Sequence, residues 1–304
     1  MPKSCSMATN IMPKMAKRFR DYRAEAANWI TLSTGEYYPD ILKDACLLYG
    51  PVLTLFGRLL SESTSSKELF LAIQNQTSNQ WLRIQLSRVF RKYVSPETPV
   101  EMLKKKSQAK SICKQFGKGF RPINEVQKAF ASRPNPDEAI CAVLWEYKDR
   151  GKKGYDLTEK FFYIFREKFP ALPIVGPERA GRDILLGEIW NEYPKKDRPV
   201  DFVIYNKDKS RVLAIGLARY DSDRGGAQED DRTGGYMNAA VEILKYCEKM
   251  GHETKIIFLN DGPGLLLGSM WEDYSYLEES HKGRILVLTL RMVPERITSK
   301  WLKA

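Results

Sequence analysis

The stretch that most constrains this chain is residues 198–236, in which a predicted β-hairpin runs directly into a dense group of charged side chains. Residues 201–205 and 211–217 are rich in β-branched and aromatic residues, and the polar run 206–210 between them is typical of a turn. Nine charged or amide side chains then follow within the fourteen residues 219–232. Acids beside bases at the end of a sheet indicate a divalent metal ion and a polyanion.

Composition limits the class of protein. The 304 residues, 43% apolar and 11% aromatic, are enough for two folded domains. The five cysteines have no paired spacing, which favours a reducing compartment over a disulfide framework or a zinc ribbon. Because there is no run of about 18 apolar residues and no signal peptide, we expect a soluble, cytoplasmic protein without a membrane segment.

The positive charge is concentrated in the first half of the chain. Residues 1–150 contain 24 Lys and Arg against 14 Asp and Glu, which is +10 of the total charge of +11. Within Arg83 to Lys128 the ratio is 12 to 3. A solvated helical face would account for one lysine-rich helix, but a basic run over several elements favours binding to a phosphate backbone.

Helical periodicity dominates up to residue 148, and the proline-containing run 132–136 is typical of a linker. We therefore predict a basic helical DNA-binding domain over residues 1–150 and a second domain over residues 151–304. The helix pair 65–93 is compatible with a helix-turn-helix reader of DNA, although antiparallel helices are common in other proteins. Its candidate DNA contacts are Arg83, Arg88 and Arg91.

The second half alternates between helical and strand patterns, which predicts an α/β fold with a mixed central sheet flanked by helices. Besides the hairpin, we expect strands at 172–175, 255–259 and 285–290 and helices at 155–169, 235–250 and 294–302, with 177–190 ambiguous between the two. Metal-dependent phosphodiester hydrolysis needs carboxylates from different elements. The candidates are Glu159, Asp201, Asp221, Asp223, Glu229, Asp230 and Asp231.

Several of these residues also have simpler interpretations. Glu159 and the acids 229–231 could favour the N-terminus of a helix, and the neighbouring arginines could pair with acids rather than with phosphate. Asp201 is harder to explain in this way, because an acid that opens a buried strand needs partners.

The order of these motifs resembles the PD-(D/E)XK nuclease superfamily, and within it the type II restriction endonucleases that cut at GATC. The run 151–159 resembles a basic glycine loop before a helix with a Glu, and 198–204 resembles the strand with the first metal-binding Asp. A return strand, a polar loop and a helix follow, and 258–271 resembles a strand that ends in a DGxG loop before a Trp. The resemblance covers about residues 151–290.

The chain departs from this family on the return strand. The E-x-K motif of the family, by register, falls on Gly216, Leu217 and Ala218. Either Asp221 and Asp223 supply a displaced pair of carboxylates, or the protein binds DNA without cleaving it.

The resemblance implies a Mg²⁺-dependent, site-specific endonuclease for double-stranded DNA that acts as a homodimer. In this hypothesis Asp201, Asp221 and Asp223 bind the metal ion and Glu159 orients the ion or a water. Contacts to phosphates or base edges are expected from Arg179, Arg182, Arg219, Arg224, Gln228 and Arg232, since Arg and Gln offer bidentate geometry to guanine and adenine. The alternatives are a non-cleaving sequence-specific DNA-binding protein and an RNA-processing protein.

Overall fold

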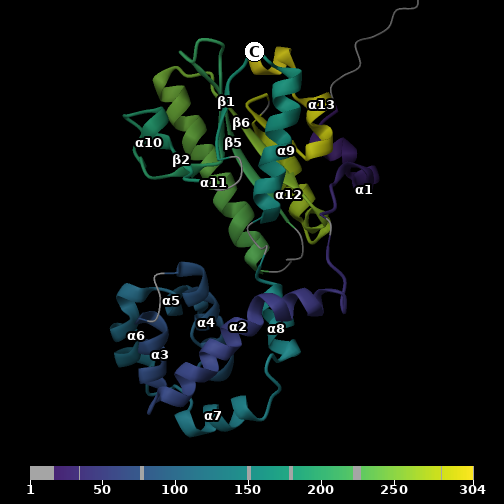
Figure 1. Ribbon diagram of the computed structural model, residues 1–304. Coiled ribbons are helices and arrows are strands. Elements are labelled where there is room, and N and C mark those ends of the chain that lie inside the picture. The colour runs from purple at the N-terminus through teal and green to yellow at the C-terminus, as the bar shows by residue number, and fades with distance from the viewer. Residues whose placement is uncertain are drawn as a thin grey trace, which may run out of the picture. The chain divides into compact units, whose positions relative to one another are not determined.

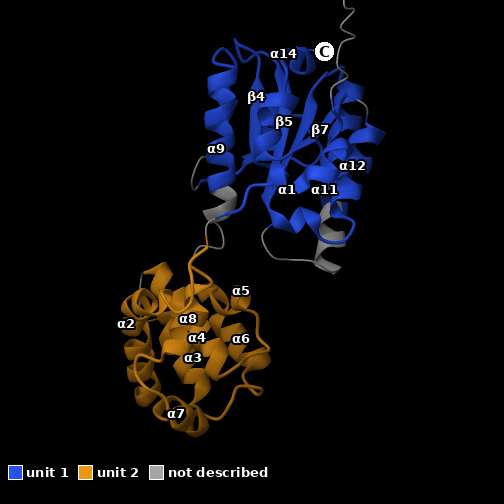
Figure 2. Ribbon diagram, turned by 90° about the vertical axis from the view of Figure 1, so that its right-hand side faces the viewer, with its two compact units in different colours: residues 1–34, 151–304 blue, residues 35–150 orange. Residues whose placement is uncertain are grey.

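The computed structural model describes residues 17–33, 35–75, 79–148, 152–177, 181–221, 227–281 and 283–303, with the side chains of 152–155 and 227–233 outside that description. It has two compact units, residues 35–150 and residues 1–34 with 151–304 (Figure 2). The predicted division placed the whole N-terminus in the helical domain. The segment 17–33 instead packs on the α/β unit, where Phe19 and Tyr22 are fully buried.

The helical unit packs its helices around an aromatic core. Phe70, Phe90 and Phe120 contact one another, with ring centroids 5.1 Å apart for Phe70 and Phe90 and 5.2 Å apart for Phe90 and Phe120. The lysine-rich run 100–118, predicted as one helix, is broken into two helices and a short 3-10 turn. The helical elements are α2 (Ile41–Glu62), α3 (Ser66–Asn75), α4 (Gln80–Tyr93), α5 (Val100–Leu103), η2 (Lys106–Gln108), α6 (Ala109–Phe116), α7 (Ile123–Ala131) and α8 (Glu138–Trp145).

The α/β unit confirms the predicted mixed sheet. Its five strands lie in the order β1-β4-β5-β6-β7, with antiparallel pairing from β1 to β5 and parallel pairing from β5 to β7. A second sheet is formed by β2 and β3. The strands are β1 (Ile174–Val175), β2 (Ile184–Leu185), β3 (Pro199–Val200), β4 (Phe202–Tyr205), β5 (Val212–Tyr220), β6 (Lys255–Asp261) and β7 (Ile285–Leu288).

Helices cover both faces of the five-stranded sheet (Figures 1 and 2). On one face α9 packs through Phe161 and Phe162 against Phe202 of β4. On the other face lie α11 and α12, and Tyr236 and Tyr274 contact Phe258 of β6. The other described helical elements of this unit are short. Its helical elements are η1 (Phe19–Glu25), α1 (Ala26–Trp29), α9 (Lys152–Lys168), α10 (Leu186–Ile189), α11 (Ala227–Met250), η3 (Pro263–Leu266), α12 (Met270–Ser280), η4 (Leu290–Met292), α13 (Val293–Arg296) and α14 (Ser299–Lys303).

Candidate functional site

Asp201 lies between β3 and β4, where the chain passes from the small sheet into the large one. Its main-chain N–H donates to the carbonyl oxygen of Gly216 at 3.0 Å, and its Oδ2 accepts from the N–H of Ala218 at 2.8 Å. Burial raises the pKa of the Asp201 carboxyl to about 6, against the lowering effect of the Ala218 hydrogen bond, and the charge of Asp183 raises it further. The environment therefore favours a proton or another cation at Asp201.

Asp183 was not among the predicted site residues. The antiparallel register pairs Ile184 of β2 with Val200 of β3. Extended by one residue, the same register places Asp183 opposite Asp201. Asp183 is exposed, so it presents a second carboxylate at the surface beside the half-buried one. The sequence around it was ambiguous between strand and helix, because β2 has only two residues and passes directly into α10. An acid before Ile184 was the only local signal.

Glu159 is half-buried on α9, on the helix that faces β4. Phe162 follows it by three residues, so the two lie on one side of α9. The Phe162 ring packs edge-on against Phe202, the residue after Asp201. Gly176 allows this close approach, because a Cβ there would lie 2.5 Å from the carbonyl oxygen of Asp201 and 2.8 Å from the Phe162 ring. Glu159 thus lies on the side of the sheet that α9 covers, which is the side on which Phe202 packs.

The return strand β5 contributes backbone, not carboxylate, at the positions of the family's acidic motif. Gly216 pairs with Phe202. A Cβ on Gly216 would lie 2.0 Å from the Phe202 ring. An aromatic ring therefore occupies the space that a side chain at position 216 would need. Ala218 acts through its N–H group on Asp201.

The second strand of the hairpin is longer than predicted. We expected it to end at Leu217, but β5 continues to Tyr220 because Arg219 and Tyr220 pair with Asn260 and Asp261 of β6. Arg219 Nε lies 2.5 Å from Oδ1 of Asp221, and both side chains are largely buried. The candidate ligand Asp221 is therefore paired with the candidate DNA contact Arg219.

The described part of the chain does not gather Asp201 and Asp221 into one metal site. Asp221 lies three residues beyond Ala218, or about 10 Å along a strand. Among the described residues, no three His, Cys, Asp or Glu side chains come together as potential metal ligands. Asp223, Arg179 and Arg224 lie outside the described residues, as do the side chains of Gln228, Arg232 and the acids 229–231.

The aspartate of the DGxG-like loop has a structural role. Asp261 is fully buried, and burial raises its pKa. Its Oδ1 accepts from the N–H groups of Thr31 at 2.6 Å and Gly262 at 2.7 Å, and its Oδ2 accepts from Leu290 at 3.0 Å. The side chain therefore ties the N-terminal segment and the chain after β7 to the end of β6.

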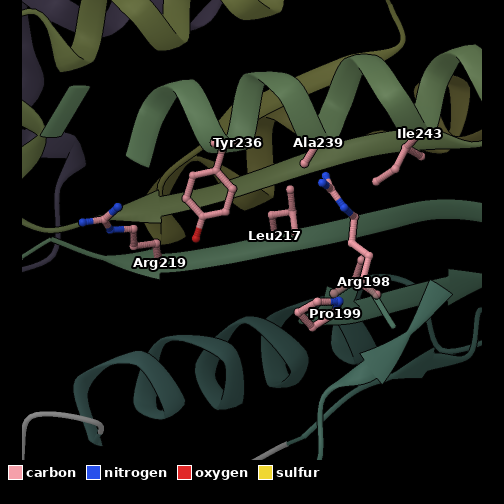
Figure 3. A pocket seen from close by; sticks show the side chains of 9 residues that line it. Arg198, Pro199, Leu217, Arg219, Tyr236, Ala239 and Ile243 are labelled. Carbon is pink, nitrogen blue, oxygen red and sulfur yellow. The ribbon is translucent and has the colours of Figure 1, made fainter. Parts of the chain in front are cut away.

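A cavity of about 570 Å³ lies between β3, β5 and α11, beside Asp201 (Figure 3). Its lining combines apolar residues with two arginines: Arg198, Pro199, Val200, Leu217, Arg219, Gly235, Tyr236, Ala239 and Ile243. Arg198 reaches up towards α11 and Arg219 extends from the far side of Tyr236 (Figure 3). Arg198 also lies 3.1 Å from Glu242. Val200 and Leu217 line the cavity and immediately precede Asp201 and Ala218, which places the cavity next to the carboxylate pair.

The predicted DNA contacts of the helical unit are largely occupied within that unit. Arg88 donates to Gln85 at 2.9 Å and stacks over Tyr147, and Arg91 donates to the carbonyl oxygen of Pro96 at 3.1 Å. Arg83 is half-buried. Helix α4, which carries all three, packs against α2, α3, α5, α7 and α8. Little of this helix remains for insertion into a DNA groove. In the α/β unit, Arg182 is exposed and bonds to Glu188.

Known proteins give no further guide to this site. No family model, curated protein or solved structure matches the chain. Over the described ranges, no helix has the length and apolar character that crossing a membrane requires. The described cysteines Cys46, Cys113, Cys141 and Cys247 are free thiols.

Proposed function

We propose that this chain is a Mg²⁺-dependent endonuclease for double-stranded DNA, of the site-specific type II restriction class. The observation that carries the proposal is Asp201, a half-buried carboxylate with a raised pKa beside Asp183. The order of elements around it supports the proposal. Helix α9 with Glu159 precedes the hairpin, α11 follows it, and β6 ends in the Asp261-Gly262 turn before Trp271.

The donor groups near Asp201 suit Mg²⁺, which is commonly held by one or two carboxylates together with substrate phosphates and waters. Asp201 and Asp183 would hold the ion. A bound Mg²⁺ would polarise the phosphodiester and lower the pKa of a coordinated water. The Ala218 N–H fixes the orientation of the Asp201 carboxylate. Glu159 on α9 remains the acid proposed to orient the ion or the water.

The cavity beside this carboxylate pair offers cations for a phosphate. Arg198 and Arg219 line it, and guanidinium groups bind phosphate oxygens in a bidentate manner. Because Arg198 is paired with Glu242 and Arg219 with Asp221, a phosphate would have to compete with these carboxylates. Arg179, Arg182, Arg224, Gln228 and Arg232 remain proposed contacts to the duplex. Cleavage of both strands at a two-fold symmetric target would require a homodimer, and restriction of incoming DNA would require a cytoplasmic enzyme.

A second candidate is a sequence-specific DNA-binding protein that does not cleave. Two observations favour it. Phe202 fills the space beside Gly216, where the family carries an acid, and Asp221 is paired with Arg219.

The two functions are separated by incubating the protein with plasmid and phage DNA, with Mg²⁺ or with EDTA. We expect discrete fragments with Mg²⁺ only, and none from the Asp201→Asn variant, which still shifts DNA on a gel. Intact DNA that is shifted by both proteins would support the non-cleaving candidate. Preference for single strands or A-form RNA over duplex DNA would contradict both.

A further inference from the structure

Four exposed lysines follow one another at four-residue spacing in and around α6 of the helical unit: Lys106 in η2, Lys110 and Lys114 on α6, and Lys118 in the turn after α6. On the opposite side of α6, Ala109, Ile112 and Cys113 are buried, and α6 packs against α3 (Figure 1). Lys110 and Lys114, four residues apart, lie on one face of α6, and Lys106 and Lys118 are exposed just before and just after this helix. We call these four lysines the row.

This charge is not compensated locally. None of the four lysines forms an ion pair with any of the residues that the structure describes. The sequence contains no acid between Glu101 and Glu125. Like charges at four-residue spacing destabilise a helix, which makes the row a costly arrangement for a surface that binds nothing.

We infer that this row, Lys106, Lys110, Lys114 and Lys118, is the surface of the helical unit that binds the phosphate backbone of duplex DNA. The inference rests on the proposed function, since it assumes that DNA is the partner. It replaces Arg83, Arg88 and Arg91 as the main contacts, because Arg88 and Arg91 are engaged within the unit and Arg83 is half-buried.

The spacing of the row fits a phosphate backbone. Lys110 and Lys114 are separated by about 6 Å of helical rise, and alternate phosphates of one B-DNA strand are about 7 Å apart along the axis. Flexible lysine side chains can span the difference. Lysine presents a point charge without the planar fork that reads base edges, so the contact would be independent of sequence. Phe116 of α6 is exposed between Lys114 and Lys118, and proteins that bind single strands stack bases on such rings, so the test compares duplex with single strands.

The test measures the affinity of the full chain for a short fluorescent duplex of random sequence over a range of salt concentrations, with EDTA present. The variant replaces all four lysines by glutamine, which keeps the helix propensity. The matched control is Lys207→Gln, Lys245→Gln, Lys249→Gln and Lys300→Gln, which removes the same charge from exposed positions of the α/β unit. Circular dichroism checks that both variants fold.

Each lost phosphate contact should reduce the slope of log K against log salt by about 0.9, so we expect the row variant to lose about 3 to 4. The loss should be equal for duplexes of different sequence, and the control should keep the slope of the unmodified chain. An unchanged slope in the row variant would overturn the inference while leaving the proposed function standing. An equal loss in both variants, or a stronger effect on single strands or RNA than on duplex, would also overturn it. An unmodified chain that binds no DNA would refute the proposed function itself.

Discussion

The main-chain N–H of Ala218 donates a 2.8 Å hydrogen bond to Oδ2 of Asp201, across the hairpin that joins them. Asp201 precedes β4 and Ala218 lies within β5, so the contact depends on the antiparallel register that pairs Phe202 with Gly216. This hydrogen bond favours the ionised carboxylate, whereas burial and the neighbouring Asp183 oppose it. Burial has the larger effect, and the pKa is about 6 in place of the usual 3.8.

The raised pKa of Asp201 predicts how stability depends on pH. Below the usual pKa, the carboxyl is protonated in both the folded and the unfolded chain and costs nothing. Between this value and about 6 the unfolded chain is ionised while the folded chain keeps its proton, so the stability falls over this interval and is constant above it. This should lower the free energy of unfolding by about 3 kcal/mol.

Asp201→Asn removes this titration and keeps an oxygen that can accept the Ala218 hydrogen bond. Its free energy of unfolding, measured with urea, should exceed that of the unmodified chain at pH 7 by more than at pH 4. Asp183→Asn removes a charge that raises the Asp201 pKa, so it should move the transition to lower pH. If Asp201→Asn changed the free energy of unfolding by the same amount at pH 4 and pH 7, the ionisation of Asp201 would not destabilise the folded chain.

Mg²⁺ binding at the carboxylate pair should stabilise the folded chain in the absence of DNA. At ten times the dissociation constant, the ion would add about 1.4 kcal/mol to the free energy of unfolding. The melting temperature at pH 7 should therefore rise with Mg²⁺ relative to EDTA, and Asp201→Asn and Asp183→Asn should abolish the rise. Asp208→Asn is the control, because Asp208 is an exposed acid in the hairpin turn. A rise that survives in Asp201→Asn would place the ion elsewhere.

Gly216, the single glycine of the hairpin 201–220, should not tolerate a side chain. A Cβ at this position meets the Phe202 ring at 2.0 Å, and the ring is itself packed against Phe161 and Phe162. Overpacking of this kind costs about 1 to 3 kcal/mol or more, so Gly216→Ala should lower the midpoint of urea unfolding. Gly234→Ala on α11 is the matched control. It meets nothing within 4 Å, and alanine should stabilise that helix by about 0.5 to 1 kcal/mol. Equal effects of the two changes would mean that Phe202 can move aside.

Local pattern was enough to predict the hairpin, the buried strand β6 and the helix α9, because each has a periodic or continuous run of apolar residues. The next helix was predicted over 235–250, whereas α11 begins at Ala227. The extension of β5 was not predictable in this way. Arg219 and Tyr220 look like the start of a polar loop, and they are held in the strand by parallel pairing with Asn260 and Asp261, about forty residues later. Asp201 was identifiable because an acid stood at the start of an apolar run.

Long-range packing decided the remaining differences. Asp183 becomes part of the site only through pairing between two strands of two residues each, which is too short for a periodic signal. The predicted helical domain over residues 1–150 included residues 17–33. Their aromatic side chains instead bury against the α/β unit, where Phe19 stacks on Trp271 at 4.3 Å.

The attachment of that N-terminal segment should depend on Glu278. This buried carboxylate accepts from the N–H of Phe19 at 2.9 Å through Oε1, from Arg296 at 2.7 Å, and from the N–H of Val287 at 2.8 Å through Oε2. Removal of one partner of a buried ion pair typically costs about 3 to 5 kcal/mol. Glu278→Ala should therefore cause a loss of this size in urea unfolding.

The neighbouring Glu279 provides the control, since it is partly exposed and pairs with Arg18 and Arg20 at the surface. Such surface pairs contribute about 0 to 1 kcal/mol, so Glu279→Ala should unfold almost like the unmodified chain. Limited trypsin digestion supplies a second measurement. In Glu278→Ala, cleavage after Arg20 and Arg23 should become faster than in Glu279→Ala, because the segment loses the acceptor of the Phe19 N–H. Equal stability and equal cleavage in the two variants would mean that apolar burial of Phe19 and Tyr22 holds the segment without Glu278.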